Sequence, residues 1–220
     1  MTNDIRITTK AGVRGHSRSA TDVPAPGKKG IDRQQVLNAA RELSNEHGVG
    51  ELSIKAVADR LGIRPPSLYA HFDGLTEIRK ELAHWGHRLL AQRLRDSAVA
   101  LTGANGVIAA AKAYLAFVRD EPGLYSATVA PGAMSEPDSR DAAREWIGVL
   151  QRLLESMGLD HDDRIHALRG IRSMVHGFGQ LEAGGQFRTE VDRDTSFDRM
   201  LRTFVEALSS PSQAFTQSAK

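Results

Sequence analysis

Five side chains in one short stretch could donate hydrogen bonds to a polyanion. They are Lys55, Arg64, Ser67, Tyr69 and His71. A tyrosine hydroxyl or a histidine N–H readily reaches phosphate oxygens, an arginine can bind guanine through two hydrogen bonds, and a serine can bond to any base. The chemistry that these residues favour is therefore recognition of nucleic acid.

Two short helices joined by a tight turn would hold these side chains. Ser53 is a good N-cap for the first helix, and Gly62 stands where a left-handed residue stops it. The apolar positions between them recur at helical spacing: Ile54, Val57, Ala58 and Leu61. Pro65 or Pro66 suits the first turn of a second helix.

The second helix is predicted over about 65–72, with Leu68 and Phe72 on its apolar face. Other positions can then face outward, namely Pro65, Ser67, Tyr69 and His71. A short helix that presents small polar and aromatic groups is typical of a helix-turn-helix entering the DNA major groove.

Three segments carry a resemblance to a known family: Ala56-Val57-Ala58, Leu61-Gly62-Ile63 and Ser67-Leu68-Tyr69-Ala70-His71-Phe72. An upstream helix is predicted from about Asp32 to Glu46, with Gly48 ending it. Together they resemble the TetR/AcrR family of one-component transcriptional regulators over about residues 31–82. The helix cap, the glycine turn, the apolar periodicity of the two helices and the final Leu-Tyr-x-His-Phe all match the pattern of this family.

The resemblance implies DNA contacts from the start of the first of these helices and from the second. Lys55, with Ser53 beside it, would contact a phosphate or a base edge. The groove-entering end would hold Arg64, Pro65, Pro66 and Ser67, while Tyr69 and His71 would contact the DNA backbone. Leu75 stands where many members have a lysine, so one ion pair to phosphate is missing.

Three alternatives compete with this interpretation. Tyr69 and His71 could be packing residues of an ordinary helical hairpin, or the chain could be a helical protein-interaction module without DNA binding. An enzyme acting on small molecules is the third, but Gly-x-Ser-x-Gly, Walker and dinucleotide glycine patterns are absent. Two groups of residues could suggest a metal site. His161-Asp162-Asp163 is explained by an acidic helix start, and His84 and His87 lack a nearby third residue that could bind the same metal ion. We therefore predict no catalytic residue, metal or cofactor.

Charge is unevenly distributed although the net charge is only +2. Residues 1–30 hold six basic and two acidic residues, 31–95 hold ten and eight, and 96–220 hold thirteen and seventeen. The positive charge thus coincides with the predicted DNA-binding part. Absence of cysteine fits a reducing compartment, and neither a secretory signal nor a long apolar segment is seen, so a cytoplasmic location is expected.

The fold is predicted to be all-α with about nine helices and four parts. Residues 1–30 form a disordered basic leader that either contacts DNA or is only poorly ordered, and 31–75 form a three-helix DNA-binding domain. Residues 76–209 form a helical effector-binding and dimerisation domain, and 210–220 a disordered tail. Helices in the larger domain are expected at about 76–98, 105–119, 140–157, 163–182 and 195–208, with another starting near Pro122 and a loop at 132–138.

The larger domain resembles a C-terminal domain known for a Trp-His-Gly motif, through Glu121-Pro122-Gly123-Leu124-Tyr125, His176-Gly177-Phe178 and Leu181-Glu182-x-Gly184. Val175 stands at the tryptophan position. This resemblance implies a small apolar or amphipathic effector and a homodimer through helices at about 163–182 and 195–208. Candidate effector contacts, for which plain core packing is the alternative, are Tyr114, Phe117, Tyr125, Trp146, Met174, His176 and Phe178.

Overall fold

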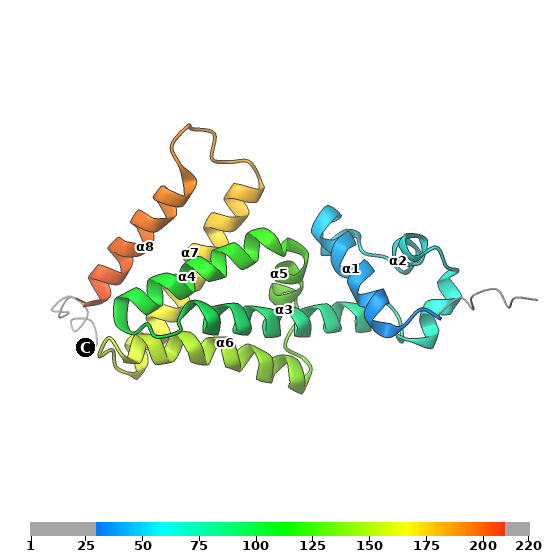
Figure 1. Ribbon diagram of the computed structural model, residues 1–220, viewed down its shortest axis with the longest axis horizontal. Coiled ribbons are helices and arrows are strands. Elements are labelled where there is room, and N and C mark those ends of the chain that lie inside the picture. The colour runs from blue at the N-terminus through cyan, green and yellow to red at the C-terminus, as the bar shows by residue number, and fades with distance from the viewer. Residues whose placement is uncertain (1–29, 210–220) are drawn as a thin grey trace, which may run out of the picture. The chain divides into compact units, whose positions relative to one another are not determined.

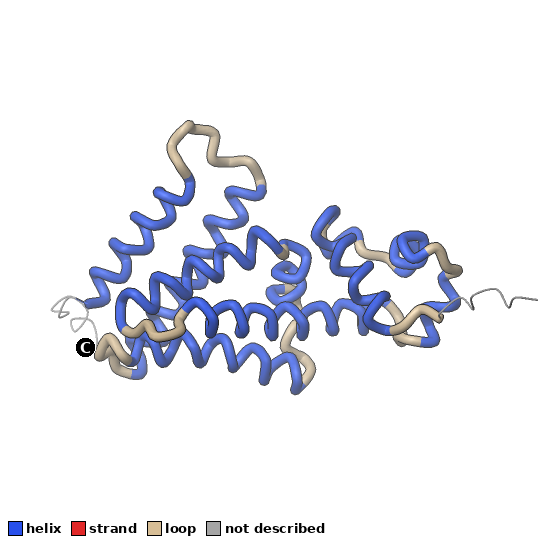
Figure 2. The backbone as a smooth tube through the Cα atoms, viewed as in Figure 1, coloured by secondary structure: helices blue, strands red, loops and turns tan. Residues whose placement is uncertain are grey.

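The structure is a computed structural model that describes residues 30–209. Within this range every regular element is a helix, and loops connect the helices (Figures 1 and 2). The prediction of an all-α fold is confirmed. The elements are α1 (Arg33–His47), η1 (Val49–Glu51), α2 (Ile54–Leu61), η2 (Pro65–Ala70), α3 (Leu75–Ser97), α4 (Gly103–Asp120), α5 (Pro122–Val129), α6 (Pro137–Glu155), α7 (His161–Ala183) and α8 (Arg193–Ser209).

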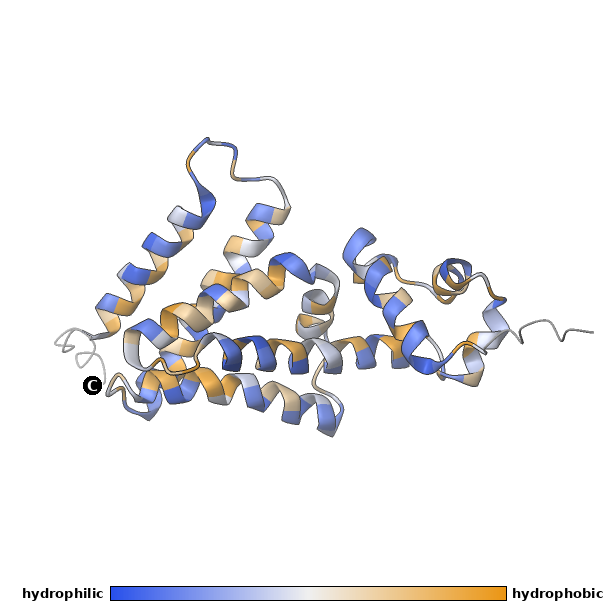
Figure 3. Cartoon of the chain, in the orientation of Figure 1, coloured by the Kyte–Doolittle hydropathy of each residue, from blue (hydrophilic) through white to orange (hydrophobic). Residues whose placement is uncertain are grey.

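Residues 1–29 and 210–220, which include the predicted leader and tail, lie outside the described range. Between residues 30 and 209, none of the helices combines the length and the apolarity needed to cross a bilayer. Figure 3 shows hydrophilic and hydrophobic residues alternating along the helices, as amphipathic helices require.

Local signals set the ends of the first helices. Asp32 caps α1 by accepting a hydrogen bond from the backbone of Gln35, whose side chain bonds back to Asp32. Ser53 caps α2, with the Ala56 N–H 3.1 Å from its hydroxyl oxygen. Gly62 ends α2 at φ 66°, in the left-handed region that glycine enters without steric cost.

The segment after the turn is a 3-10 helix and is shorter than the predicted helix over 65–72. Pro65 and Pro66 occupy its first turn, where a missing N–H costs no helical hydrogen bond. The Ser67 N–H bonds to the Arg64 carbonyl at 2.9 Å, and the His71 N–H to the Leu68 carbonyl at 2.9 Å. These three-residue spacings define 3-10 geometry.

Helix α3 connects the first four helical segments to the rest of the chain, and it packs against α4, α5 and α6 (Figure 1). The short helix α5 is buried between α1 and α3. Gly86 of α3 permits this approach, because a Cβ there would lie 2.6 Å from a methyl group of Thr128. Gly123 does the same toward α1, where a Cβ would lie 2.5 Å from the backbone of Ser44.

Helices α7 and α8 form a hairpin joined by a loop, and α4 packs against both (Figure 1). Gly170 of α7 lies under the ring of Phe204 of α8. Phe178 of α7 contacts Phe197 of α8, with ring centroids 5.1 Å apart.

Candidate nucleic-acid interface and helical interior

The outward face of η2 rests on a buried anchor. Leu68 is completely buried and Phe72 nearly so, which anchors the segment in the hydrophobic core beside α2. Tyr69 is 59% exposed on the opposite side, where its hydroxyl is free to meet a partner. Ser67 is also exposed, and His71 is half-buried at the end of the segment. Neither Tyr69 nor His71 is therefore enclosed by neighbouring helices.

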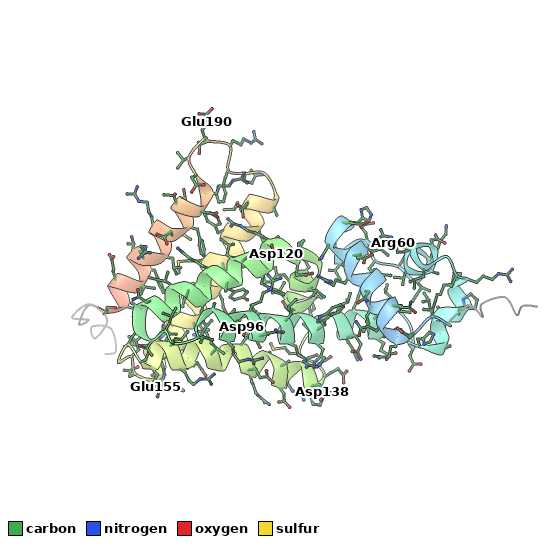
Figure 4. All side chains as sticks on the ribbon, viewed as in Figure 1. Arg60, Asp96, Asp120, Asp138, Glu155 and Glu190 are labelled. Carbon is green, nitrogen blue, oxygen red and sulfur yellow. The ribbon has the colours of Figure 1, made fainter. Side chains whose placement is uncertain are left out.

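Two cations close to this face have no counter-ion. Lys55 and Arg64 are exposed and form no ion pair with any residue from 30 to 209. Arg60 of α2 (labelled in Figure 4) differs, because its guanidinium contacts the carboxylates of Glu46 and Glu42. The unpaired cations are thus the two that sequence analysis places at the DNA interface.

The remaining members of the predicted DNA-contact set are Ser53, Pro65 and Pro66. The Ser53 hydroxyl is exposed and accepts the cap hydrogen bond, which leaves its proton and one lone pair available to a ligand. Pro66 is exposed and Pro65 is half-buried. The two prolines offer ring surface and a fixed backbone.

The start of α3 carries an acidic group that sequence analysis did not consider. The Glu77 carboxylate accepts a hydrogen bond from the Asp73 backbone N–H at 2.5 Å and one from Arg33 at 2.6 Å. The backbone N–H, followed by the Arg33 guanidinium, holds the pKa of Glu77 below its ordinary value. A phosphate approaching this helix start would meet that negative charge.

A polar junction, which sequence analysis also missed, joins α1 to the start of α5. Glu121 is only 4% exposed, and its carboxylate binds the guanidinium of Arg41, with Arg41 Nε 2.7 Å from Oε2. Asn45 Nδ2 donates to the same oxygen at 3.0 Å, and the Gly123 N–H donates to Asn45 Oδ1 at 2.8 Å. Burial would raise the pKa of Glu121, but these hydrogen bonds outweigh burial and lower it.

Four candidate effector contacts form one aromatic cluster in the helical interior: Tyr114, Phe117, Tyr125 and Trp146. All are buried. Tyr114 contacts both Tyr125 and Trp146, with centroids 6.3 Å and 5.6 Å apart, and Phe117 contacts Tyr125 at 6.4 Å.

The other three candidates all lie on α7. His176 is exposed, yet its Nδ1 lies 2.6 Å from the Tyr125 hydroxyl, so it joins the cluster from outside. Met174 and Phe178 are half-buried against the core. Phe178 contacts Phe187 and Phe197 rather than the tyrosines.

A cavity of about 620 Å³ opens beside α5, a volume that suits a small organic ligand. Val118 and Arg119 of α4, Tyr125 and Ser126 of α5, and Glu182 of α7 are among its lining residues. Helix α5 therefore borders this cavity while its first residues contact α1.

Comparison with known proteins agrees with both halves of the chain. A model described as bacterial regulatory proteins, tetR family, matches residues 36–82, and one described as tetracyclin repressor-like, C-terminal domain, matches 107–204. The HTH-type transcriptional regulator YobS of Bacillus subtilis is 32% identical over 180 residues, covering 81% of this chain and 93% of its own.

Solved structures share the fold. A protein of unknown function from Rhodococcus aligns with a TM-score of 0.70 at 22% identity, covering 84% of this chain and 99% of its own. A variant of TetR from Acinetobacter baumannii in complex with minocycline aligns with a TM-score of 0.59 at 22% identity, covering 82% and 99%.

Proposed function

This chain belongs to the tetR family of bacterial regulatory proteins and is a DNA-binding transcriptional regulator, and we propose that it is a ligand-responsive repressor acting as a dimer on a pseudo-palindromic operator. Family membership assigns it to regulators rather than enzymes. A cytoplasmic location follows from this proposal, because the operator is found there. The proposed DNA-binding domain is 31–75, and the proposed effector-binding and dimerisation domain is 76–209.

The observation that carries the DNA-binding role is the exposed face of η2 above buried Leu68. We assign Tyr69 and His71 to the phosphate backbone, because a hydroxyl and a ring N–H suit phosphate oxygens. Arg64 and Ser67 would meet base edges, where arginine can bind guanine bidentately. Lys55 would add a phosphate contact, and Ser53 and the two prolines would contribute close packing against the groove.

Footprinting on the DNA upstream of its own gene tests this role. The wild-type protein should protect a two-fold symmetric site, with half-sites about 34–36 Å apart or somewhat more. Tyr69→Ala and His71→Ala should each lower affinity for that duplex while leaving dimerisation unchanged. His166→Ala, an exposed position on α7, serves as the control. Wild-type affinity in both variants would favour the interaction-module alternative.

Dimerisation is proposed through the outer faces of α7 and α8, at about 163–182 and 195–208. Met200 of α8 is 37% exposed, and Phe204 and Leu208 on the same helix are half-buried. A two-fold axis would bury these apolar groups against their copies. In analytical ultracentrifugation, Met200→Glu should shift the protein toward monomer. The same change at Met134, an exposed methionine in the α5–α6 loop, should not.

The effector response is proposed to pass through α5 as well as α3. An effector in the domain 76–209 would displace side chains such as Tyr125, while Glu121 of the same helix holds α1. An effector that prefers the conformer with misplaced DNA-binding domains must weaken DNA binding by the same factor by which DNA weakens effector binding. An effector that binds the protein without changing its affinity for the operator would contradict this proposal.

A further inference from the structure

Two polar groups at the aromatic cluster have no protein partner for a proton or a charge among residues 30–209. One is the ring of His87 on α3, which is only 3% exposed. The other is the guanidinium of Arg172 on α7, an exposed residue. Trp146 lies between them: its Nε1 is 3.3 Å from His87 Nδ1, and the Arg172 guanidinium carbon is 5.2 Å from the centroid of its ring.

The hydrogen bond from Trp146 fixes the tautomer of His87. An indole N–H can only donate, so His87 Nδ1 must accept. Burial, aided by the neighbouring His84 and Arg172, lowers the pKa of His87 to about 4, and the ring is therefore neutral at pH 7. Its single proton then resides on Nε2. That buried N–H has no acceptor among residues 30–209, although buried donors are normally paired.

Arg172 is a cation without a counter-anion. Its guanidinium lies over Trp146 and close to Tyr114, but no carboxylate from the described part of the chain pairs with it. Other arginines of the same domain, such as Arg93 and Arg119, do contact carboxylates. The charge of Arg172 also acts on Tyr125, so it lies close to the whole aromatic cluster.

We propose that the effector is an organic anion whose carboxylate pairs with Arg172 and whose apolar body lies against Trp146 and Tyr114. An acceptor atom of the effector takes the Nε2 proton of His87. This identification rests on the proposed function, since it names the chemistry of the ligand in the effector domain. A guanidinium that lies over an indole ring keeps its planar N–H groups available to bind a carboxylate.

The test uses matched probes on the full-length protein. Octanoate and benzoate are titrated by isothermal calorimetry alongside octanamide, benzamide, octylamine and benzylamine, which keep the body and change the head group. At least one carboxylate should bind about tenfold or more tightly than its amide and amine, because only the carboxylate makes charge-assisted bonds to arginine. Long-range proton–nitrogen NMR should show the His87 proton on Nε2, with that nitrogen shifting when the carboxylate is added.

The variant Arg172→Gln should weaken carboxylate binding about tenfold or more. Arg152→Gln removes the same charge from an exposed position on α6, outside the proposed dimer and DNA-binding surfaces, and should bind as wild type does. Amides or amines that bind as well as the carboxylates, unchanged affinity in Arg172→Gln, or no carboxylate binding up to about 1 mM would each overturn the proposal. Operator footprinting on the same samples separates this outcome from failure of the proposed function, since DNA binding without effector does not need Arg172.

Discussion

Arg41 of α1 and Glu121 at the start of α5 form an ion pair across the junction between the proposed DNA-binding and effector domains. The carboxylate is almost completely buried, whereas the guanidinium is partly exposed. A buried carboxylate that loses its cation is strongly destabilising, because its desolvation is no longer compensated. This pair therefore ties α5 to α1 more firmly than a surface ion pair could.

Arg41→Gln should lower the free energy of unfolding by about 2 kcal/mol, less than for a fully buried pair because Arg41 is partly exposed. The double variant with Glu121→Gln should recover part of that loss, giving a coupling energy of about 1 kcal/mol or more. Urea unfolding of the four proteins provides the measurement. The exposed pair Arg95–Glu145 is the control, with an expected coupling below about 0.5 kcal/mol. Equal couplings for the two pairs would contradict the prediction.

Gly123→Ala should destabilise the protein by about 1–3 kcal/mol, because the new methyl group would collide with the backbone of α1 at Ser44. Gly148→Ala in α6 is the matched change, since its Cβ would meet only the flexible end of Arg152 at 3.4 Å. There we expect no loss, or a gain of up to about 1 kcal/mol from better helix propensity. Thermal unfolding of both variants distinguishes a steric effect from a general effect of replacing glycine.

The buried ring of His87 predicts a pH dependence of stability. Its folded-state pKa of about 4 lies below the ordinary 6.5, so in the window between them the unfolded chain binds a proton that the folded chain excludes. The stabilisation is complete above pH 6.5 and is lost as the pH falls toward 4, by roughly 3 kcal/mol in total. Denaturant unfolding across this range measures it. His87→Gln should flatten the curve, whereas exposed His166→Gln should leave its slope unchanged; parallel curves for all three proteins would refute the assignment.

Lys55 and Arg64 should differ in how they affect DNA binding. Lys55→Ala should weaken binding to all duplexes and reduce the logarithmic salt slope by about 2 for a dimer, one phosphate contact per protomer. Arg64→Ala should also relax discrimination at one base position, at a cost of about 1–3 kcal/mol. Fluorescence anisotropy against salt concentration and operator variants tests both. Arg188→Ala, in the α7–α8 loop, is the control for loss of a positive charge.

The helix bounds predicted from the sequence agree best with the structure where neighbouring residues decide them. The predicted α2 agrees with the observed one because the Ser53 cap and the Gly62 stop act within a few residues. Helix α6 begins three residues before its predicted start at 140, since Pro137 fits a first helical turn. The type of η2 was not predicted, because two apolar positions, Leu68 and Phe72, do not distinguish three-residue from four-residue hydrogen bonding.

Relationships between distant residues could not be predicted in this way. Arg41 and Glu121 are 80 positions apart, and only the packing of α5 on α1 brings them together. The motif around Glu121 was noticed, but nothing in it identifies Arg41 as its partner. His176 was grouped with buried pocket residues, yet it is exposed and reaches Tyr125 from the surface. One-dimensional patterns do not specify such side-chain directions.

The paired prolines of η2 have a consequence for how this regulator could acquire a new target. Their rings fix the backbone angle φ at positions 65 and 66 of η2. A change of preferred base sequence is therefore not expected to come from a rearranged backbone there. Retargeting would have to exchange the side chains at 64 and 67, which meet base edges, on an unchanged frame. That makes this short segment a tractable place for directed evolution of operator choice, with two positions to randomise.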